Sequence, residues 1–489
     1  MTNEALVSPE TAEEELCRIL EVYRDSSLSS WSTYALYELD GTPEAAAQRE
    51  ATKAAFLHGE VRNPQLNYPV LDSDEVGEKL AQAEKTALGL MKDSVRLDYD
   101  VDRELALYDN LRISLLEVAI GQISRRLTTE TLTAEERANL VDLFNIANDQ
   151  VFGPIQPERF NGLLARVHKR IETILADPNV PQQIREAAEY LTTNRVYDPT
   201  VPTTVPVQVP EETLQALKEL VITNNKDILA CVPTKPEGET LSIDEMAEMF
   251  RQAHAVRQTG WGVEVDEGKT NVDTRQAEKV THIGKERKPS TSQEAAKALL
   301  HENGIHVERR EQGDRLGDPL LAGLGFKGAQ NAEEGLATIM EEVYAGKTRE
   351  AGTAYYLALG WAKGLDGKPR DFRDVFELGW RRRAIGQYSK NPAEFTYGDI
   401  EKAKNSAYTT CVRIFRGTPC DIPGMVYTKD QQYFVGNQSM WEFLTRVAQL
   451  PEDERSQTFG RLFRSKFDPT NDRHNRILDK ALERAGLES

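Results

Sequence analysis

A proline-rich segment, residues 197–210, interrupts an otherwise helical pattern and limits the folds that this chain can adopt. The segment contains four prolines. Proline lacks a backbone N–H and disfavours helical torsion angles in the residue before it, so a continuous helix through this segment is excluded. We therefore expect a helical N-terminal domain at 1–196, a linker or surface strap at 197–210, and a second domain at 211–489.

Helical periodicity fills most of the remaining chain. Before the proline-rich segment, apolar residues recur at the spacing of an amphipathic helix. These patterns predict helices over 78–96, 103–127, 133–148 and 155–177. After the segment, the same reasoning predicts helices over 331–345, 350–365, 371–385, 397–415 and 439–450.

Two capping patterns and one valine-rich stretch complete the secondary-structure prediction. Ser242 is followed by Glu245, and Thr291 by Glu294, at the spacing of a capping box that opens a helix. Between 261 and 283, valines and an isoleucine stand among Gly, Asp, Asn and Lys, which predicts short strands. The predicted fold class is α+β, mainly α, with a small β-sheet.

The charge balance argues against nucleic acid and membranes as partners. The chain has 60 Lys and Arg against 79 Asp and Glu, a net charge of -19, and phosphate and anionic lipid repel such a surface. The first residues lack the pattern of a signal peptide, and no apolar run is long enough for a membrane span. We expect a cytoplasmic protein. Its four cysteines lack CxxC spacing, which favours reduced thiols.

The residues that carry chemistry are His301, Glu302 and His306. In a regular helix, side chains five positions apart point roughly 140° away from each other, so these histidines could not share a metal ion. A π-type bulge supplies the missing rotation, and such bulges concentrate at functional sites. Gly304 lies between the histidines and lets the backbone adjust at low steric cost. The spacing therefore predicts a helix distorted around Gly304.

Two histidines and one carboxylate are a familiar ligand set for catalytic zinc. Glu302 would be the general base, which takes a proton from a water molecule that zinc makes more acidic. Glu334 is the candidate third ligand, on a later helix. The spacing leaves a second interpretation open, in which Asn331 caps that helix and Glu334 completes a capping box without any metal. The two histidines could likewise be unrelated residues of a surface helix.

A longer series of motifs accompanies these residues along the chain. It runs His301-Glu-Asn-Gly-Ile-His306, Arg309, Gly313, Glu333-Glu-Gly-Leu-Ala337, Arg413-Ile-Phe-Arg-Gly417, Tyr427-Thr-Lys-Asp430, Tyr433 and Gly436-Asn437. The series resembles the metallopeptidase-like family with a QEGLA motif, over roughly residues 210 to 450. That family includes microtubule-associated tyrosine carboxypeptidases and bacterial proteins described as flavohaemoglobin expression modulators. Asn303, Ile305 and Gln312 depart from the family pattern.

The resemblance implies a gluzincin-like catalytic domain in which His301, His306 and Glu334 hold zinc. It also implies a carboxypeptidase that removes a C-terminal residue, tyrosine among the candidates, from a peptide or protein. Arg309 is expected to orient a carboxylate near the metal or to pack against the metal helix. We expect His282 to be a solvated or core histidine.

A carboxypeptidase also needs a cation for the terminal carboxylate and a donor for the oxyanion that develops on the scissile carbonyl. The candidate cations are Arg413, Arg416 and Lys429, and the candidate donor is Tyr433. Structural explanations remain open for each of them. An arginine near a helix C-terminus can serve the helix dipole, and Lys429 with Asp430 can be a turn pair.

The second hypothesis is a non-catalytic, metal-containing protein with a regulatory or binding role. A metal kept only for structure is usually enclosed by four protein ligands and needs no neighbouring base. The presence of Glu302 beside His301 therefore favours the peptidase.

Overall fold

The computed structural model describes residues 9–26, 28, 36–37, 43–94, 100–194, 200–204, 207–267, 269–323 and 325–487. Helices make up most of this part of the chain, which confirms the mainly α prediction. The helices before the proline-rich segment are α1 (Pro9–Asp25), α4 (Pro43–Leu57), α5 (Pro69–Asp72), α6 (Asp74–Ser94), α7 (Val101–Thr129), α8 (Ala134–Phe152), α9 (Pro157–Ala176) and α10 (Gln182–Asn194).

The elements after the proline-rich segment include a small sheet and the helix that carries both histidines. The first of them are α11 (Glu211–Asn224), α12 (Lys226–Leu229), α13 (Ile243–Arg257), β1 (Gly262–Asp266), β2 (Val272–Arg275), β3 (Val280–Gly284), α14 (Ser292–His301), η1 (Glu302–Val307) and α15 (Glu308–Leu316). They are followed by η2 (Lys327–Ala329), α16 (Gln330–Tyr344), α17 (Thr353–Lys363), α18 (Phe372–Lys390), η3 (Pro392–Glu394), α19 (Tyr397–Ile414), η4 (Thr428–Asp430), α20 (Gln431–Val447), α21 (Glu452–Arg461) and α22 (Asp472–Arg484).

The strands predicted between 261 and 283 are confirmed and form one sheet with the order β1–β3–β2. β1 runs parallel to β3, whereas β2 runs antiparallel to β3. Helix α13 packs against β1 and β3. The His254 ring of α13 lies beside the buried Thr281 of β3, with 3.1 Å between Nε2 and the hydroxyl oxygen. The sheet is therefore anchored on the helices rather than standing alone.

Local signals in the sequence locate most helix starts correctly. Both predicted capping boxes are present, at Ser242 with Glu245 and at Thr291 with Glu294. Helix α6 begins at Asp74 rather than at 78, and α20 begins at Gln431 rather than at 439. Polar residues and a glycine weaken the helical pattern over the first turns of α20, and packing against α16 overrides this low propensity.

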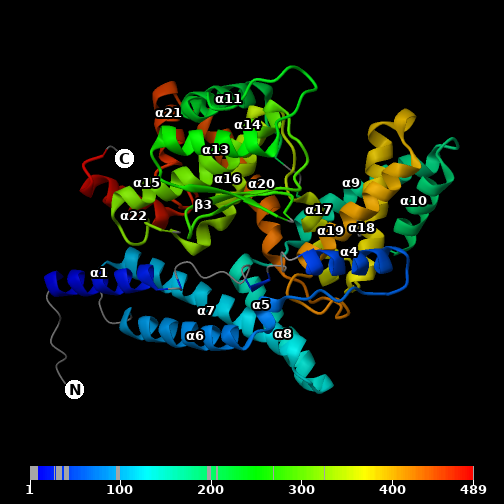
Figure 1. Cartoon of the computed structure of the whole chain (residues 1–489), viewed down its shortest axis with the longest axis horizontal. Coiled ribbons are helices and arrows are strands. Elements are labelled where there is room, and N and C mark those ends of the chain that lie inside the picture. Colours follow the sequence, from blue (N-terminus) through cyan, green and yellow to red (C-terminus); the bar gives the residue numbers. More distant parts are fainter. Residues whose placement is uncertain are drawn as a thin grey trace.

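Three hydrophobic cores hold the helices together, and two of them combine residues from both sides of the proline-rich segment. The first core joins α1, α6, α7 and α8 to α22. The second joins α9 and α10 to α17, α18 and α19, and the third surrounds α14 and α16. Figure 1 shows these three groups at the lower left, the right and the upper left. The domain division at 197–210 stays a prediction.

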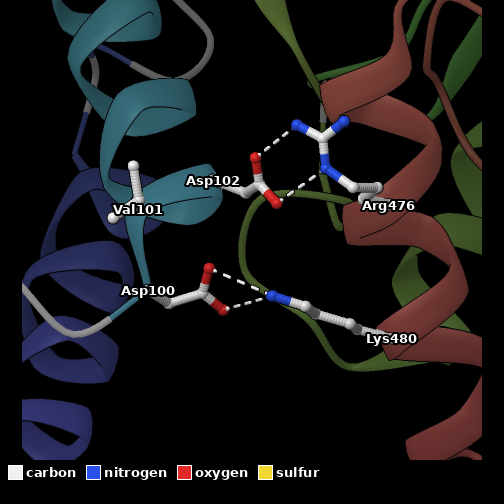
Figure 2. A pocket seen from close by; sticks show the side chains of 5 residues that line it. All are labelled: Asp100, Val101, Asp102, Arg476 and Lys480. Carbon is white, nitrogen blue, oxygen red and sulfur yellow. Dashed lines mark hydrogen bonds and ion pairs between the residues drawn. The ribbon is translucent and has the colours of Figure 1, made fainter.

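Ion pairs join α22 to the start of α7, as Figure 2 shows. Arg476 donates two hydrogen bonds to Asp102, at 2.9 and 2.7 Å, and the Lys480 ammonium lies 3.3 Å from both carboxylate oxygens of Asp100. Solvent-exposed pairs contribute only about 0–1 kcal/mol each. Burial of apolar residues such as Ile477 in the first core therefore supplies most of the attachment.

The described part of the proline-rich segment is held against two helices. The Asn161 side chain of α9 donates a hydrogen bond to the carbonyl of Val201, at 2.9 Å. The Val207 N–H donates to the side-chain oxygen of Gln438 on α20, at 3.0 Å. The valine also packs against the third core. The segment thus contacts one helix that precedes it in the sequence and one helix that follows it.

Helices α16 and α20 approach closely because glycine faces glycine where they cross. A Cβ atom on Gly335 would lie 2.3 Å from the carbonyl oxygen of Gly436, and a Cβ on Gly436 would lie 1.9 Å from that of Asn331. Neither position has room for a larger residue. The crossing therefore fixes the backbone of α16 against α20 at Gly335, next to Glu334 in the sequence.

Within the described ranges, no helix combines the length and the apolar character that a membrane span requires. The four cysteines are free thiols, as expected, and Cys411 and Cys420 are buried.

Gly436→Ala is expected to destabilise the protein, because overpacking a close contact typically costs about 1–3 kcal/mol. The matched control is Gly89→Ala in α6, where a Cβ atom would meet nothing within 4 Å. That control should be neutral or gain roughly 1 kcal/mol from better helix propensity. Chemical denaturation of both variants tests this, and equal stability would contradict the proposed close crossing.

A pH dependence of stability follows from His474 of α22. Its buried ring stacks on Phe326, with 3.9 Å between ring centroids, and its Nδ1 accepts a hydrogen bond from the Asp468 N–H at 3.2 Å. Burial, with the charge of Arg473 acting in the same direction, lowers the pKa of His474 to about 4. An unfolded histidine has a pKa of about 6.5, so the unfolded state binds the proton first as the pH falls.

The contribution of His474 to the free energy of unfolding is therefore complete above about pH 6.5. It decreases as the pH falls from there to the folded-state pKa of about 4. His474→Phe keeps the stacked ring and removes the titrating group, so its stability should fall less over this window. The difference between the two proteins corresponds to roughly 1.4 kcal/mol for each unit of pKa shift. Parallel curves of unfolding free energy against pH would exclude this role for His474.

Candidate metal centre

The helix that carries both histidines is distorted at the predicted place. Helix α14 ends at His301 and continues directly into η1, a π-helical turn that contains Glu302 and His306. α15 then resumes the ordinary α-helical pattern. A Cβ atom on Gly304 would lie 3.0 Å from the Asn225 side chain, so glycine also allows close packing at this turn. The π-type distortion predicted from the histidine spacing is confirmed.

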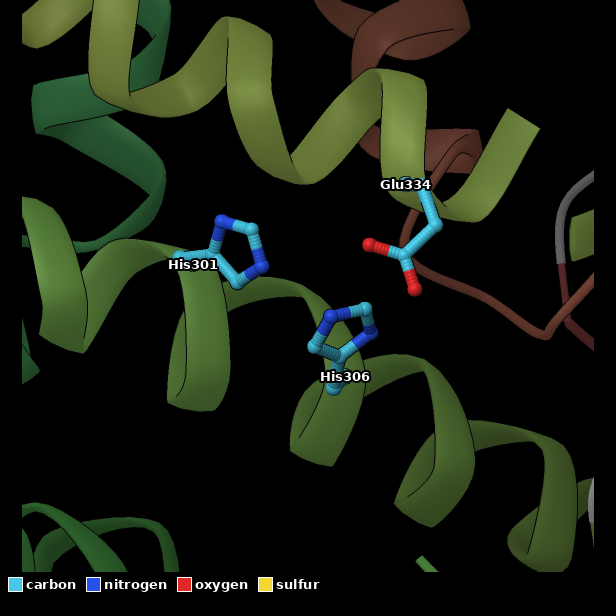
Figure 3. Close-up of side chains that lie close together, drawn as sticks. All are labelled: His301, His306 and Glu334. Carbon is cyan, nitrogen blue, oxygen red and sulfur yellow. The ribbon is translucent and has the colours of Figure 1, made fainter. Parts of the chain in front are cut away.

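The π-turn brings both histidines to the side of the helix that faces α16, as Figure 3 shows. His301, His306 and Glu334 each offer one ligand atom, and these atoms lie within 4.8 Å of one another. The two imidazole centroids are 5.1 Å apart. The described residues thus form a group of possible metal ligands. Two histidine nitrogens and one carboxylate fit zinc, whose catalytic sites use such a set.

Each histidine is oriented by a carboxylate on α16. His301 Nδ1 lies 2.7 Å from Glu341 Oε1, and His306 Nδ1 lies 2.9 Å from Glu333 Oε1. A carboxylate only accepts hydrogen bonds, so each Nδ1 carries the proton. Nε2 is then the ring nitrogen that can bind a metal, and carboxylate partners of this kind fix the tautomer of zinc-binding histidines.

The carboxylate behind His306 is itself held by a buried arginine. Arg309 is fully buried and donates a hydrogen bond to Glu333, as well as to the carbonyls of Ser465 and Phe467. Burial alone would raise the pKa of Glu333, but Arg309 and His306 lower it to about 2. Glu333 therefore stays ionised, and Arg309 has the carboxylate-orienting role expected from the sequence.

The carboxylate behind His301 lies nearer to solvent and has its own cationic partner. Arg349 donates a hydrogen bond to Glu341 at 2.7 Å. Burial opposes ionisation of Glu341, but His301 and Arg349 together keep its pKa below the usual range. Both candidate ligand histidines thus contact ionised glutamates.

The electrostatics of the centre favour a cation. Burial alone would lower the pKa of His301, but the hydrogen bond to Glu341 and the charges of Glu302 and Glu334 raise it to about 9. The same negative groups would attract a metal cation placed among them. A zinc ion would be stabilised by charge as well as by direct coordination.

Glu302 is buried beside the candidate ligands. Burial raises its pKa, while the charges of His301 and His306 act in the opposite direction. Thr274 of β2 also lies near enough to influence this carboxylate. A carboxylate with a raised pKa is a better proton acceptor near neutral pH.

The capping interpretation of Glu334 is wrong. Helix α16 has Ala329 at its N-cap without a side-chain capping bond, and Asn331 lies inside the helix. The Asn331 side-chain oxygen is buried without a hydrogen-bond partner in the part of the chain that the structure describes. Glu334 is therefore not part of a capping box and is available to the metal group.

The other predicted catalytic residues lie around the start of α20 and the end of α19. Arg413 forms two hydrogen bonds with Asp430, at 2.8 and 2.9 Å, so its charge is already compensated. Its guanidinium carbon lies 5.5 Å from the centre of the Tyr433 ring. Lys429 is half-buried in η4, close enough to Lys466 for its charge to lower the pKa of that lysine.

Arg416 lies close enough to Tyr68 to affect it electrostatically. Burial raises the pKa of the Tyr68 phenol, and the charge of Arg416 acts in the opposite direction. The catalytic roles assigned from the sequence to Arg416, Lys429 and Tyr433 remain predictions.

A second group of possible metal ligands lies on the sheet and contains Glu264, Asp266 and His282. His282 is buried, as expected for a core histidine, and its Nδ1 lies 3.1 Å from Asp266. The Lys269 ammonium lies 2.6 Å from the same carboxylate. Because this ammonium already compensates Asp266, the first group is the better candidate for a metal site.

Sequence reasoning did not single out Glu333, Glu341 or Lys466. A signal existed for Glu341, which follows Glu334 by two helical turns and so lies on the same face of α16. Lys466 follows α21 in the chain, and no spacing relates it to the histidines. Only the packing of the chain brings it near Glu334, whose charge acts on the pKa of Lys466.

Neither the models of known protein families nor the curated protein sequences contain a match to this chain.

Replacing Glu341 by Gln should weaken zinc binding, because loss of such a carboxylate partner typically reduces metal affinity about 10–100-fold. Glu442→Gln is the matched control, since Glu442 is an exposed glutamate on α20. Zinc affinity can be measured by competition with a chromophoric chelator. Equal affinity of the two variants would contradict the orienting role of Glu341.

Proposed function

We propose that this chain is a zinc-dependent peptidase that acts as a carboxypeptidase on the C-terminus of a peptide or protein. The observation that carries the proposal is the convergence of His301, His306 and Glu334, whose ligand atoms lie within 4.8 Å of one another, with Glu302 beside them. Three protein ligands leave zinc a position for water or substrate, which is the arrangement of a catalytic site.

The chemistry of zinc and of Glu302 defines the role of each in the proposed reaction. Zinc, when bound, supplies Lewis acidity that makes a water molecule more acidic and polarises a carbonyl. Glu302 would take a proton from the water molecule as the water oxygen bonds to the scissile carbonyl carbon. The same residue then delivers that proton to the amine nitrogen as the C–N bond breaks. Burial of Glu302 raises its pKa and strengthens it as a base.

Strand β2 offers a place for the substrate backbone. Among the described strands it pairs only with β3, so it forms an edge of the sheet. It also carries Thr274, which acts on Glu302. Extended peptides commonly bind by adding a strand to such an edge. A substrate bound along β2 would pass close to the proposed base.

Removal of a C-terminal residue also requires groups for the carboxylate and the oxyanion. In this proposal Lys429 and Arg416 serve the carboxylate, and Tyr433 donates to the oxyanion. Its ring stands 6.3 Å from Tyr355 and near Arg413 at the start of α20. The resemblance to the QEGLA-motif family supports the same assignment, and we include membership of that family and a cytoplasmic location in the proposal.

Glu302→Gln should retain zinc and lose peptidase activity. General acid–base catalysis contributes about 10²–10⁴-fold to rates, so a decrease of that order is expected in kcat. The measurement is cleavage of a set of peptides with varied C-terminal residues by zinc-loaded wild type and variant. His306→Ala serves as the control that should lose zinc and activity together.

Zinc content is measured on every sample, because it separates the two hypotheses. Bound zinc without cleavage that depends on Glu302 would favour the non-catalytic regulatory or binding protein.

A further inference from the structure

Lys466 is a buried cation that the proposed chemistry does not use. It is only 8% exposed. Its ammonium group makes no hydrogen bond or ion pair with any residue within the described ranges. Burial lowers the pKa of Lys466, since a charge removed from water is costly without a partner. The charges of Glu333 and Glu334 act in the opposite direction. An ammonium in this position can bind an additional anion.

The position of Lys466 is fixed by the same arginine that supports the metal centre. Arg309 donates hydrogen bonds to the carbonyls of Ser465 and Phe467, the residues on either side of the lysine. On the other side, the backbone of Gly325 lies so close that a Cβ atom there would be 2.5 Å from the Lys466 carbonyl. The lysine backbone is therefore held from both directions.

Lys466 lies at the edge of the candidate metal centre, because Arg309 joins the residues on either side of the lysine to Glu333, which contacts His306. Glu333, Glu334, Arg309 and Lys429 all act on its pKa. Glu333 is already paired with Arg309 and His306, and Glu334 is assigned to the metal. Within the part of the chain that the structure describes, the Lys466 ammonium consequently has no hydrogen-bonded anion of its own.

We propose that Lys466 binds the α-carboxylate of the C-terminal residue of the substrate. This inference rests on the proposed peptidase function and makes Lys466 the residue that selects a free C-terminus. A carboxylate bound there would supply the anion that the buried ammonium lacks. A peptide without a free C-terminal carboxylate would leave that ammonium unpaired and would bind poorly.

The test uses the zinc-loaded full chain and one N-acetylated tetrapeptide, made with a free C-terminal carboxylate and as the C-terminal amide. Lys466→Met should raise KM for the free acid at least about tenfold, the loss expected for one hydrogen bond to a charged group. Neither kcat nor cleavage of the amide should change much. Lys466→Arg should recover part of the preference for the acid. Lys480→Met, on the distant α22, is the matched control.

A structural role for Lys466 predicts a different pattern. If the lysine only balances Glu333 and Glu334, Lys466→Met will alter zinc affinity or thermal stability and will affect acid and amide equally. An equal effect on both peptides overturns the proposal. Loss of the acid preference with zinc content and melting temperature unchanged supports it.

Binding measurements separate this inference from the proposed function. Calorimetry with zinc-loaded Glu302→Gln reports the affinity of both peptides without turnover. If the wild type cleaves neither peptide, the peptidase proposal fails. Preferential binding of the acid, lost in the double variant with Lys466→Met, would still support the carboxylate site. Equal binding of acid and amide would overturn it.

Discussion

The buried contact between Arg309 and Glu333 is the interaction on which the candidate site depends. Arg309 follows the π-turn, Glu333 belongs to α16, and the same guanidinium holds the carbonyls of Ser465 and Phe467 near the C-terminus. Three separate parts of the chain are therefore joined at one cation. Removal of one partner from a buried pair typically costs about 3–5 kcal/mol, because the remaining charge is left uncompensated. The pair thus links the stability of the fold to the geometry of the histidines.

Charged side chains of both signs surround this contact. Glu302, Glu334 and Glu341 create a negative environment around His301. Lys466 adds a positive charge, and its ammonium makes no hydrogen bond or ion pair within the described residues. A metal cation suits the negative group, and a carboxylate suits the lysine. In the proposed peptidase, the scissile carbonyl would lie near the metal and the terminal carboxylate near Lys466.

Two unusual backbone features make this arrangement possible. The π-helical turn of η1 rotates His306 to the same side as His301, which a regular helix would not allow. The crossing of Gly335 and Gly436 lets the backbones of α16 and α20 approach closely, which fixes the helix that carries Glu334. The π-turn departs from regular α-helical geometry, and the two glycines have low helix propensity. Both are maintained by the packing of the third core around α14 and α16.

Patterns between residues close in the sequence explain what could be predicted. The capping boxes at Ser242 and Thr291 and the short strands follow from such neighbours. The distortion around Gly304 could be predicted from the spacing of the two histidines, although core packing maintains it. The tertiary structure alone decided that Glu334 is no cap, that α20 starts at Gln431, and that Lys466 lies beside the candidate metal centre. These outcomes depend on which distant surfaces pack together, and packing energy summed over a core outweighs the propensity of a single turn.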